Sequence, residues 1–253
     1  MITNGWREIC EKDFHANLEH WKKQRRYINR FFIGGIKSRA EKEYYSLLCR
    51  NVKDRVVLDY GCGFGHSSFF LIQNGARKCI GIDISRSMIE QAKKQYNHNR
   101  ILFCQMSCEY LGFPDNKFDL ICGKAILHHL DFPKALQEIY RTLKDGGIAI
   151  FLEPLGHNPF IKIFRKLTPK ARSAAESPLT ENDIELCRKY FKLDHKEFLF
   201  TLIPFLVLKK FMPKKFFTSF HNFTDYIDRY ILGRSKKTYK FFWISLLMLR
   251  KEL

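Results

Sequence analysis

The stretch VVLDYGCGFGHSS, residues 56–68, decides the fold of this chain. Its first residues are aliphatic and β-branched and end at Asp59, which predicts a buried strand. Glycines follow at 61, 63 and 65, where they predict a tight turn that runs into a helix. Glycine permits positive φ and close approach of a ligand to the backbone, and the first N–H groups of a helix favour an anion. The stretch therefore predicts a strand–loop–helix unit that holds a carboxylate or phosphate group.

A second predicted strand, residues 79–82, ends in another carboxylate, Asp83. Asp83 follows the first glycine by roughly 20 residues, which places it to accept both hydroxyls of an adenosine ribose. A dinucleotide fingerprint would require glycine at position 66, where this chain has His66. The motif Asp-x-Gly-x-Gly-x-Gly together with Asp83 instead resembles the class I S-adenosylmethionine (SAM) dependent methyltransferases. A structural glycine loop in another α/β protein is the alternative interpretation.

The resemblance covers the segment from about residue 50 to residue 155 and implies an enzyme with SAM as its cofactor. In the family, the position that matches Ser107 usually carries an acidic residue that accepts a hydrogen bond from the adenine amino group. Serine carries no charge, so the adenine contact is open at this position. The implied cofactor-binding residues are Asp59, Gly61, Cys62, Gly63, Gly65, Asp83, Ile84, Ser107, Cys108 and Gly123.

Strand-like and helix-like patterns alternate along the chain, which predicts a parallel sheet with helices packed on it. Ser85 is predicted to cap one helix, Thr180 and Asp183 form a capping box for another, and Asp119 is interpreted as structural. The family's fold implies a doubly wound α/β sheet of seven mostly parallel strands, with strand seven antiparallel. We expect strands at 56–59, 79–82, 101–104, 118–122, 148–152, 198–203 and 241–249, and helices at 66–73 and after Ser85, Asp131 and Thr180.

Two segments lie outside this alternating pattern. Residues 1–50 are basic and aromatic, with a helix predicted at 38–49, and similar methyltransferases fold such a segment over the cleft as a helical cap. A helix packed on the sheet edge with a solvated basic face is the alternative. Residues 203–238 form an aromatic and basic insertion within the predicted methyltransferase domain, 51–253. The insertion is interpreted as a lid on an apolar acceptor pocket, a homodimer contact, an element on an anionic membrane surface, or ordinary core. The apolar run at 198–208 is too short, and too broken by Pro204, to span a bilayer.

Charge and cysteine content bound the location and the partners. The net charge of +18 predicts attraction to nucleic acid or to an acidic membrane leaflet, with a solvated basic surface as the alternative. The eight cysteines lack paired Cys-x-x-Cys spacing, and no His or Cys cluster completes a zinc site around Cys104 and Cys108, so no metal site is predicted. Scattered thiols and an N-terminus without an apolar signal-peptide core indicate a cytoplasmic protein, with membrane association as a variant.

The fourth predicted strand is followed by Leu127-His128-His129-Leu130. Many family members that act on small molecules carry a similar string, whereas methylases of exocyclic nitrogens have a Pro-Pro-aromatic motif there. We therefore expect a small-molecule or lipid-like acceptor that receives the methyl group on a hydroxyl. An RNA methyltransferase that uses the basic surface, and an inactive SAM-binding homologue, are the alternatives.

A hydroxyl acceptor requires a base, and histidines are the candidates. We predict His157 or His128 for this role, with His129 as a further candidate and Glu153 behind them. Because ligands of open α/β sheets bind beyond the carboxyl ends of the strands, these side chains are expected to converge on one crevice with Asp59 and Asp83.

Overall fold

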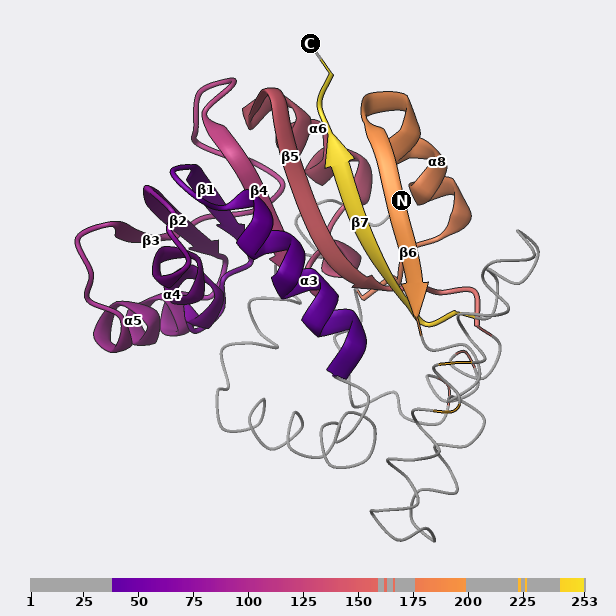
Figure 1. The fold of residues 1–253 in the computed structure, drawn as a ribbon, viewed down its shortest axis with the longest axis horizontal. Helices are drawn as coiled ribbons and strands as arrows, with labels where there is room; N and C mark the ends of the chain where they lie inside the picture. Colours follow the sequence, from indigo (N-terminus) through magenta and orange to yellow (C-terminus); the bar gives the residue numbers. More distant parts are fainter. Residues whose placement is uncertain are drawn as a thin grey trace, which may run out of the picture.

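A computed structural model describes residues 38–158, 162, 166, 176–198, 223, 226 and 242–252 of the 253-residue chain. Seven strands form a single sheet in the order β3-β2-β1-β4-β5-β7-β6 (Figure 1). The first five are mutually parallel, and β7 runs antiparallel to both β5 and β6. The predicted α/β sheet with an antiparallel strand seven is confirmed. The strands are β1 (Val56–Tyr60), β2 (Lys78–Asp83), β3 (Ile101–Gln105), β4 (Phe118–Lys124), β5 (Leu143–Pro154), β6 (Lys192–Phe198) and β7 (Ile244–Arg250).

The helices cover both faces of the sheet, as the apolar runs of the central strands require. Tyr44 and Leu48 of α3 and Leu71 of α4 are fully buried in one apolar cluster. Leu136 of α6 and Ile184 of α8 belong to a second cluster, on the other face. Figure 1 shows α3 crossing the sheet in front, with α6 and α8 behind it. The described helices are α3 (Ser38–Asn51), α4 (His66–Gln73), α5 (Arg86–Gln95), the 3-10 turn η2 (Leu127–His129), α6 (Phe132–Thr142) and α8 (Glu181–Tyr190).

Local capping signals in the sequence are confirmed. The Ser85 side chain accepts a hydrogen bond from Met88 N at the start of α5. Thr180 and Asp183 form a reciprocal capping box at the start of α8. Asp119 is structural, because its carboxylate accepts from Val56 N at 2.8 Å and pairs with Lys144 at 2.7 Å. These contacts fix where the elements begin, and with them the edge on which the strand ends gather.

The sequence prediction of strand six was wrong in position. We expected it at 198–203, whereas β6 is Lys192–Phe198 and the residues after Phe198 lie outside the described part of the chain. β6 is an edge strand whose residues 192–196 alternate between exposed and half-buried. An edge strand of this kind carries charged side chains and few apolar ones. The segment after it is more apolar, so the strand was predicted there.

The other predicted elements differ from the structure by a few residues or lie outside the described part of the chain. Strand seven was expected at 241–249 and runs from Ile244 to Arg250, and strand five was expected at 148–152 and runs from Leu143 to Pro154. The predicted helix at 38–49 is α3, which packs on β5 and β7. The rest of the predicted cap and nearly all of the 203–238 insertion lie outside the described residues. Within the described part, no helix is both long enough and apolar enough to cross a bilayer.

Candidate cofactor and acceptor site

The candidate site lies where the strand order reverses. From β1 the chain builds β2 and β3 to one side and then returns to place β4 on the other side. In open α/β sheets, ligands bind beyond the carboxyl ends of the strands at such a switch point. Asp59 and Asp83 lie at this edge on β1 and β2, and Glu153 lies there on β5. We call the β1–β2 part the cofactor edge and the β4–β5 part the acceptor edge.

The glycine loop between β1 and α4 has a left-handed backbone at all three glycines. The φ angles are 71° at Gly61, 54° at Gly63 and 79° at Gly65, values that disfavour other residues. A Cβ on Gly61 would lie 2.6 Å from Ile126, so glycine at this position is also required by packing. Among the described residues, a Cβ on Gly63 would meet only the Met88 sulfur, at 3.9 Å. The backbone at Gly63 is therefore open to a ligand.

Asp83 is held against this loop by backbone amides. Its Oδ2 accepts from Gly63 N and its Oδ1 from Ser85 N, each at 2.9 Å. These bonds orient the carboxylate, and each carboxylate oxygen offers two acceptor positions. Asp83 can therefore accept the hydroxyls of a ribose while it keeps the loop in place.

Asp59 is buried beneath the loop, with 2% of its surface exposed. It accepts a hydrogen bond from Ser68 Oγ at 2.5 Å. Burial raises the pKa of Asp59 to about 6, a shift that the Ser68 hydroxyl opposes and the charge of Asp83 reinforces. Asp59 and Asp83 lie on the neighbouring parallel strands β1 and β2. A cation placed nearby would favour the ionised form of Asp59.

Three predicted cofactor-binding residues near the end of β3 take part in hydrogen bonds within the protein. Ser107 Oγ accepts from Glu109 N at 3.2 Å, and the Cys108 carbonyl accepts from the Tyr60 hydroxyl. The Ile84 carbonyl accepts from the Gln105 amide at 3.2 Å. These bonds fix the loop after β3 against the ends of β1 and β2. Cofactor binding by Ile84, Ser107 and Cys108 stays a prediction.

The two remaining cofactor-site candidates serve packing. Cys62 donates its backbone N–H to the Ile82 carbonyl at 2.8 Å, and burial raises the pKa of its thiol well above the ordinary value. The Cys62 side chain is therefore a buried thiol and not a nucleophile. A Cβ on Gly123 would lie 2.8 Å from both Ile126 and Phe151, so glycine lets β4 and the turn after it pack closely.

Glu153 and His128 form a buried pair at the acceptor edge. Glu153 is 1% exposed, and its Oε1 accepts from Ile126 N at 2.8 Å and Leu127 N at 3.0 Å. Its Oε2 lies 2.7 Å from His128 Nδ1. Glu153 therefore anchors η2 and orients the His128 ring, so it is a positioning residue. His157 follows β5 and is half-buried, and its catalytic role stays a prediction.

One group at this edge was missed by the sequence prediction. His128, His129 and Glu176 offer ligand atoms that all lie within 4.8 Å of one another. Glu176 lies far along the chain from the histidine pair, in a segment without a recognisable motif. Only tertiary structure brings it there, so no spacing rule could have indicated the group.

The site residues fit an adenosyl donor. Gly65 is the N-cap of α4 and no described side chain caps that helix, so its first-turn N–H groups can bind the carboxylate of an amino-acid moiety. Gly63 leaves the backbone approachable beside these groups. Asp83 supplies acceptors for sugar hydroxyls. The cofactor edge thus offers partners for the carboxylate and for the ribose hydroxyls of SAM.

Comparison with known proteins agrees with this geometry. Residues 58–151 match the family model described as a methyltransferase domain. This segment is a class I SAM-dependent methyltransferase domain. An uncharacterized methyltransferase, YcgJ, from Bacillus subtilis is 34% identical to the chain over 115 residues, which are 43% of this chain and 45% of that protein. Phosphoethanolamine N-methyltransferase 3 of Arabidopsis thaliana is 34% identical over 120 residues, 45% of this chain and 23% of that protein.

Solved structures extend the likeness in fold beyond residues 58–151. A SAM-dependent methyltransferase from Mesorhizobium loti superposes with a TM-score of 0.60 at 19% identity, covering 86% of this chain and all of that one. The chain spans less than half the length of the two curated relatives named above. The likeness in fold therefore extends beyond residues 58–151, the segment that matches the family model in sequence.

Proposed function

We propose that this protein transfers the methyl group of SAM to a small or lipid-like acceptor, and that the accepting atom is a hydroxyl oxygen. The observation that supports the proposal most directly is the contact between Asp83 and the glycine loop. It places a preoriented carboxylate next to an approachable backbone and the amino end of a helix. The Arabidopsis relative is named for phosphoethanolamine, a small molecule, which also favours a small acceptor.

Methyl transfer from SAM requires the protein to position the acceptor more than to polarise a bond. SAM supplies a methyl group that its sulfonium already activates, so alignment of the acceptor and exclusion of water contribute most of the rate. An acceptor hydroxyl must also lose its proton. His128 lies at the acceptor edge with its Nδ1 bonded to Glu153, so Nε2 is the ring nitrogen that can meet such a hydroxyl. Glu153 acts only through His128.

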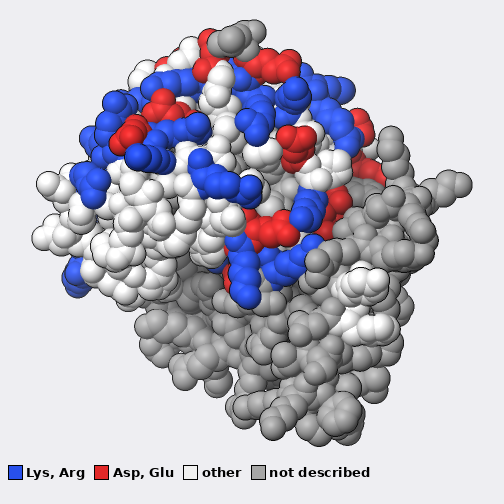
Figure 2. Space-filling view, viewed as in Figure 1, with Lys and Arg blue, Asp and Glu red and all other residues white. Residues whose placement is uncertain are grey.

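The distribution of described charges favours a small acceptor over RNA. Figure 2 shows Lys and Arg spread over the upper part of one face, with Asp and Glu among them. Arg77, Arg100 and Lys117 are exposed and lie at the amino ends of β2, β3 and β4. Parallel strands have their amino ends on the edge opposite their carboxyl ends, so these cations lie opposite the acceptor edge. RNA bound by them would not reach the candidate site.

Calorimetric titration with SAM tests the proposal, using wild type, Asp83→Ala and Asp119→Asn. We expect heat of binding from the wild type and from Asp119→Asn, and its loss in Asp83→Ala, because only Asp83 is placed to contact the ribose. Asp119 is a matched control, since it also accepts a backbone N–H and lies on the opposite edge of the sheet. Absence of SAM binding by the wild type would remove the proposed activity.

Acceptor class is tested separately, by formation of S-adenosylhomocysteine. We expect turnover with hydroxyl-bearing small molecules or with lipid vesicles that contain them. Methyl incorporation into RNA, with affinity that falls steeply as salt rises, would replace the small-molecule assignment by the RNA one. SAM binding without turnover on any acceptor would favour the inactive homologue. The membrane and dimer contacts of residues 203–238 are predictions that vesicle binding and sedimentation can test.

A further inference from the structure

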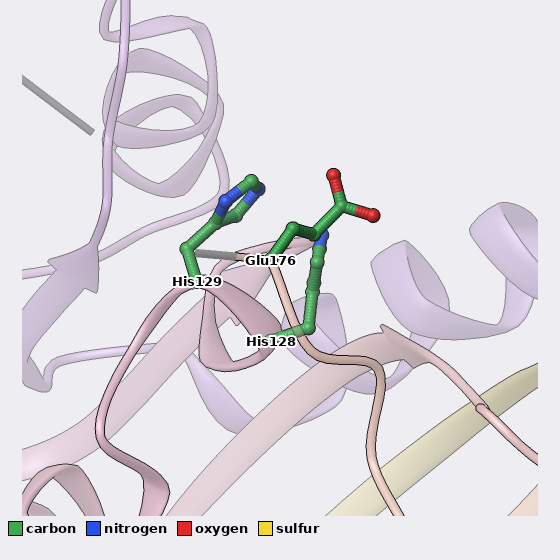
Figure 3. A group of neighbouring side chains, drawn as sticks. All are labelled: His128, His129 and Glu176. Atoms are coloured by element: carbon green, nitrogen blue, oxygen red, sulfur yellow. The ribbon is translucent and has the colours of Figure 1, made fainter. Parts of the chain in front are cut away.

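Three potential metal ligands gather at the acceptor edge. His128, His129 and Glu176 place one nitrogen or oxygen atom each within 4.8 Å of the others. His128 is buried, whereas His129 and Glu176 are half-buried, so the group lies at the border between core and surface. Figure 3 shows the three side chains projecting to the same side of the ribbon, the two histidines from the turn after β4 and Glu176 from the neighbouring segment.

Backbone hydrogen bonds bring these three residues together. Ser177 N donates to the His128 carbonyl at 2.7 Å, which fixes Glu176 beside the histidine turn. The segment around Leu179 is held to the end of β5 by Leu179 N to the Pro154 carbonyl, at 3.1 Å, and Gly156 N to the Leu179 carbonyl, at 2.9 Å. The position of Glu176 is therefore set by main-chain pairing and not by its side chain alone.

Glu153 gives His128 the hydrogen bonding that a metal ligand requires. Oε1 of Glu153 accepts two backbone N–H groups, and its Oε2 lies 2.7 Å from His128 Nδ1. Because an ionised carboxylate only accepts, the Nδ1–H donates to it, and the Nε2 of the neutral ring keeps its lone pair. A carboxylate behind a histidine in this way fixes the ring and raises its basicity in many metal sites. This pairing is independent of the cluster itself.

We propose that His128, His129 and Glu176 bind one divalent transition metal ion, with Zn²⁺ as the best match. Two imidazole nitrogens and one carboxylate oxygen form a set that Zn²⁺ uses at sites with a position left open for water or substrate. The same set excludes Ca²⁺ and Mg²⁺ as preferred ions, because those take mainly oxygen ligands. The three atoms must move closer together than in the metal-free structure to share one ion.

The effect of a bound metal ion on catalysis rests on the proposed function. A metal at the acceptor edge would bind an acceptor through oxygen, so the substrate class becomes small molecules with a hydroxyl, phosphate or carboxylate oxygen free to occupy the open position. Metal coordination also lowers the pKa of a bound hydroxyl. In the metal-bound protein His128 would be a ligand, and the acceptor hydroxyl, with its pKa lowered by the ion, would lose its proton to a water molecule.

Metal binding is measured on the full chain by titration with Zn²⁺ and with Co²⁺, whose visible spectrum distinguishes nitrogen and oxygen ligands from thiolates. Every protein carries Cys49→Ser, because Cys49 is exposed and a thiol would compete. We compare His129→Gln and Glu176→Gln with His195→Gln. His195 pairs with Glu197 at 3.0 Å on β6, so it is a histidine beside a carboxylate that belongs to no described three-ligand group.

We expect one equivalent of metal with a spectrum free of thiolate bands, and about tenfold or greater loss of affinity in His129→Gln and Glu176→Gln. His195→Gln should match its parent within twofold, and Glu153→Gln should weaken binding about 10- to 100-fold through His128. Absence of binding by the parent, or unchanged affinity in both ligand variants, overturns the proposal. SAM titration of the same proteins separates the two claims, because loss of SAM binding by the parent would overturn only the proposed function.

Discussion

Asp59 and Glu153 are both buried carboxylates near the carboxyl end of a strand, but their surroundings differ. Asp59, on β1, is 2% exposed and accepts from the Ser68 hydroxyl. Glu153, on β5, is 1% exposed and meets two backbone N–H groups and a histidine ring. Burial penalises a carboxylate's charge, and each donor offsets part of that penalty. Few donors leave Asp59 with a raised pKa, of about 6.

The difference separates two uses of a buried acid. Glu153 is an anchor, because three donors depend on it and would be left unsatisfied without it. Asp59 is adjustable, because its protonation can change near neutral pH and respond to a cation bound beside it. The charge of Asp59 at the cofactor edge can therefore change when a ligand binds, whereas Glu153 at the acceptor edge holds neighbouring groups in place.

Removing the anchor should have the largest effect. Glu153→Ala leaves Ile126 N, Leu127 N and His128 Nδ1 without their acceptor, and we expect a loss of about 3 kcal/mol or more in the free energy of unfolding. Urea denaturation measures it. Glu153→Gln keeps an acceptor oxygen for the two amides, so it should lose less, about 1–2 kcal/mol. A Glu153→Ala protein as stable as the wild type would show that η2 does not depend on this carboxylate.

Removing the adjustable charge should give an effect that depends on pH. The pKa of Asp59 is raised in the folded state from 3.8 to about 6, so the folded protein binds the extra proton and wild-type stability falls as pH rises through this window. Asp59→Asn lacks this titration. The stability of the wild type relative to Asp59→Asn should therefore fall between pH 4 and pH 7, by up to about 3 kcal/mol at 1.4 kcal/mol per pKa unit.

Urea denaturation of both proteins at several pH values gives this difference directly. A difference that stays constant with pH would contradict the role assigned to Asp59. SAM affinity provides a second measurement, because the positive charges of SAM favour the ionised form of Asp59. Its affinity for the wild type should increase as pH rises through about 6, and Asp59→Asn should not show the increase.

Alanine substitutions at two glycines test the difference between the cofactor edge and the opposite edge of the sheet. Gly63 and Gly146 have φ angles of 54° and 72°, and neither has a described atom closer than 3.9 Å to where a Cβ would lie. Alanine at either should cost about 1–2 kcal/mol of stability through left-handed strain. Only Gly63→Ala should also weaken SAM binding, by about tenfold or 1.4 kcal/mol. Equal SAM affinity of the two variants would mean that the ligand does not approach the backbone at Gly63.

Weakening the single side-chain donor of Asp59 should have the smallest effect on stability. Ser68→Ala removes a buried hydroxyl that donates to Asp59, at a cost of about 1 kcal/mol. Because that hydroxyl lowers the pKa of Asp59, its loss should move the Asp59 titration to higher pH. The pH series described for Asp59→Asn, repeated on a Ser68→Ala background, measures the shift. A titration at unchanged pH would mean that the backbone around Ser68 stabilises the carboxylate instead.

The cofactor edge could be predicted because its signals are local. The strand that contains Asp59, the glycine spacing and the Ser85 cap each lie within a few residues, so hydrophobic pattern and turn chemistry suffice to place them. β6 was placed too late in the sequence because an edge strand such as Lys192–Phe198 buries little and carries many charges. Its identity as a strand comes from pairing with β7, which no local pattern contains.

The sequence by itself determined the parallel sheet, the glycine loop and the carboxylates that face it, since strand periodicity and short-range spacing dictate all three. Tertiary structure alone decided what Glu153, His128 and Glu176 do. Their partners come from a different strand, a 3-10 turn and a distant segment, and main-chain pairing brings these together only when the sheet is complete. A carboxylate's role follows from the donors around it, and here those donors are distant in sequence.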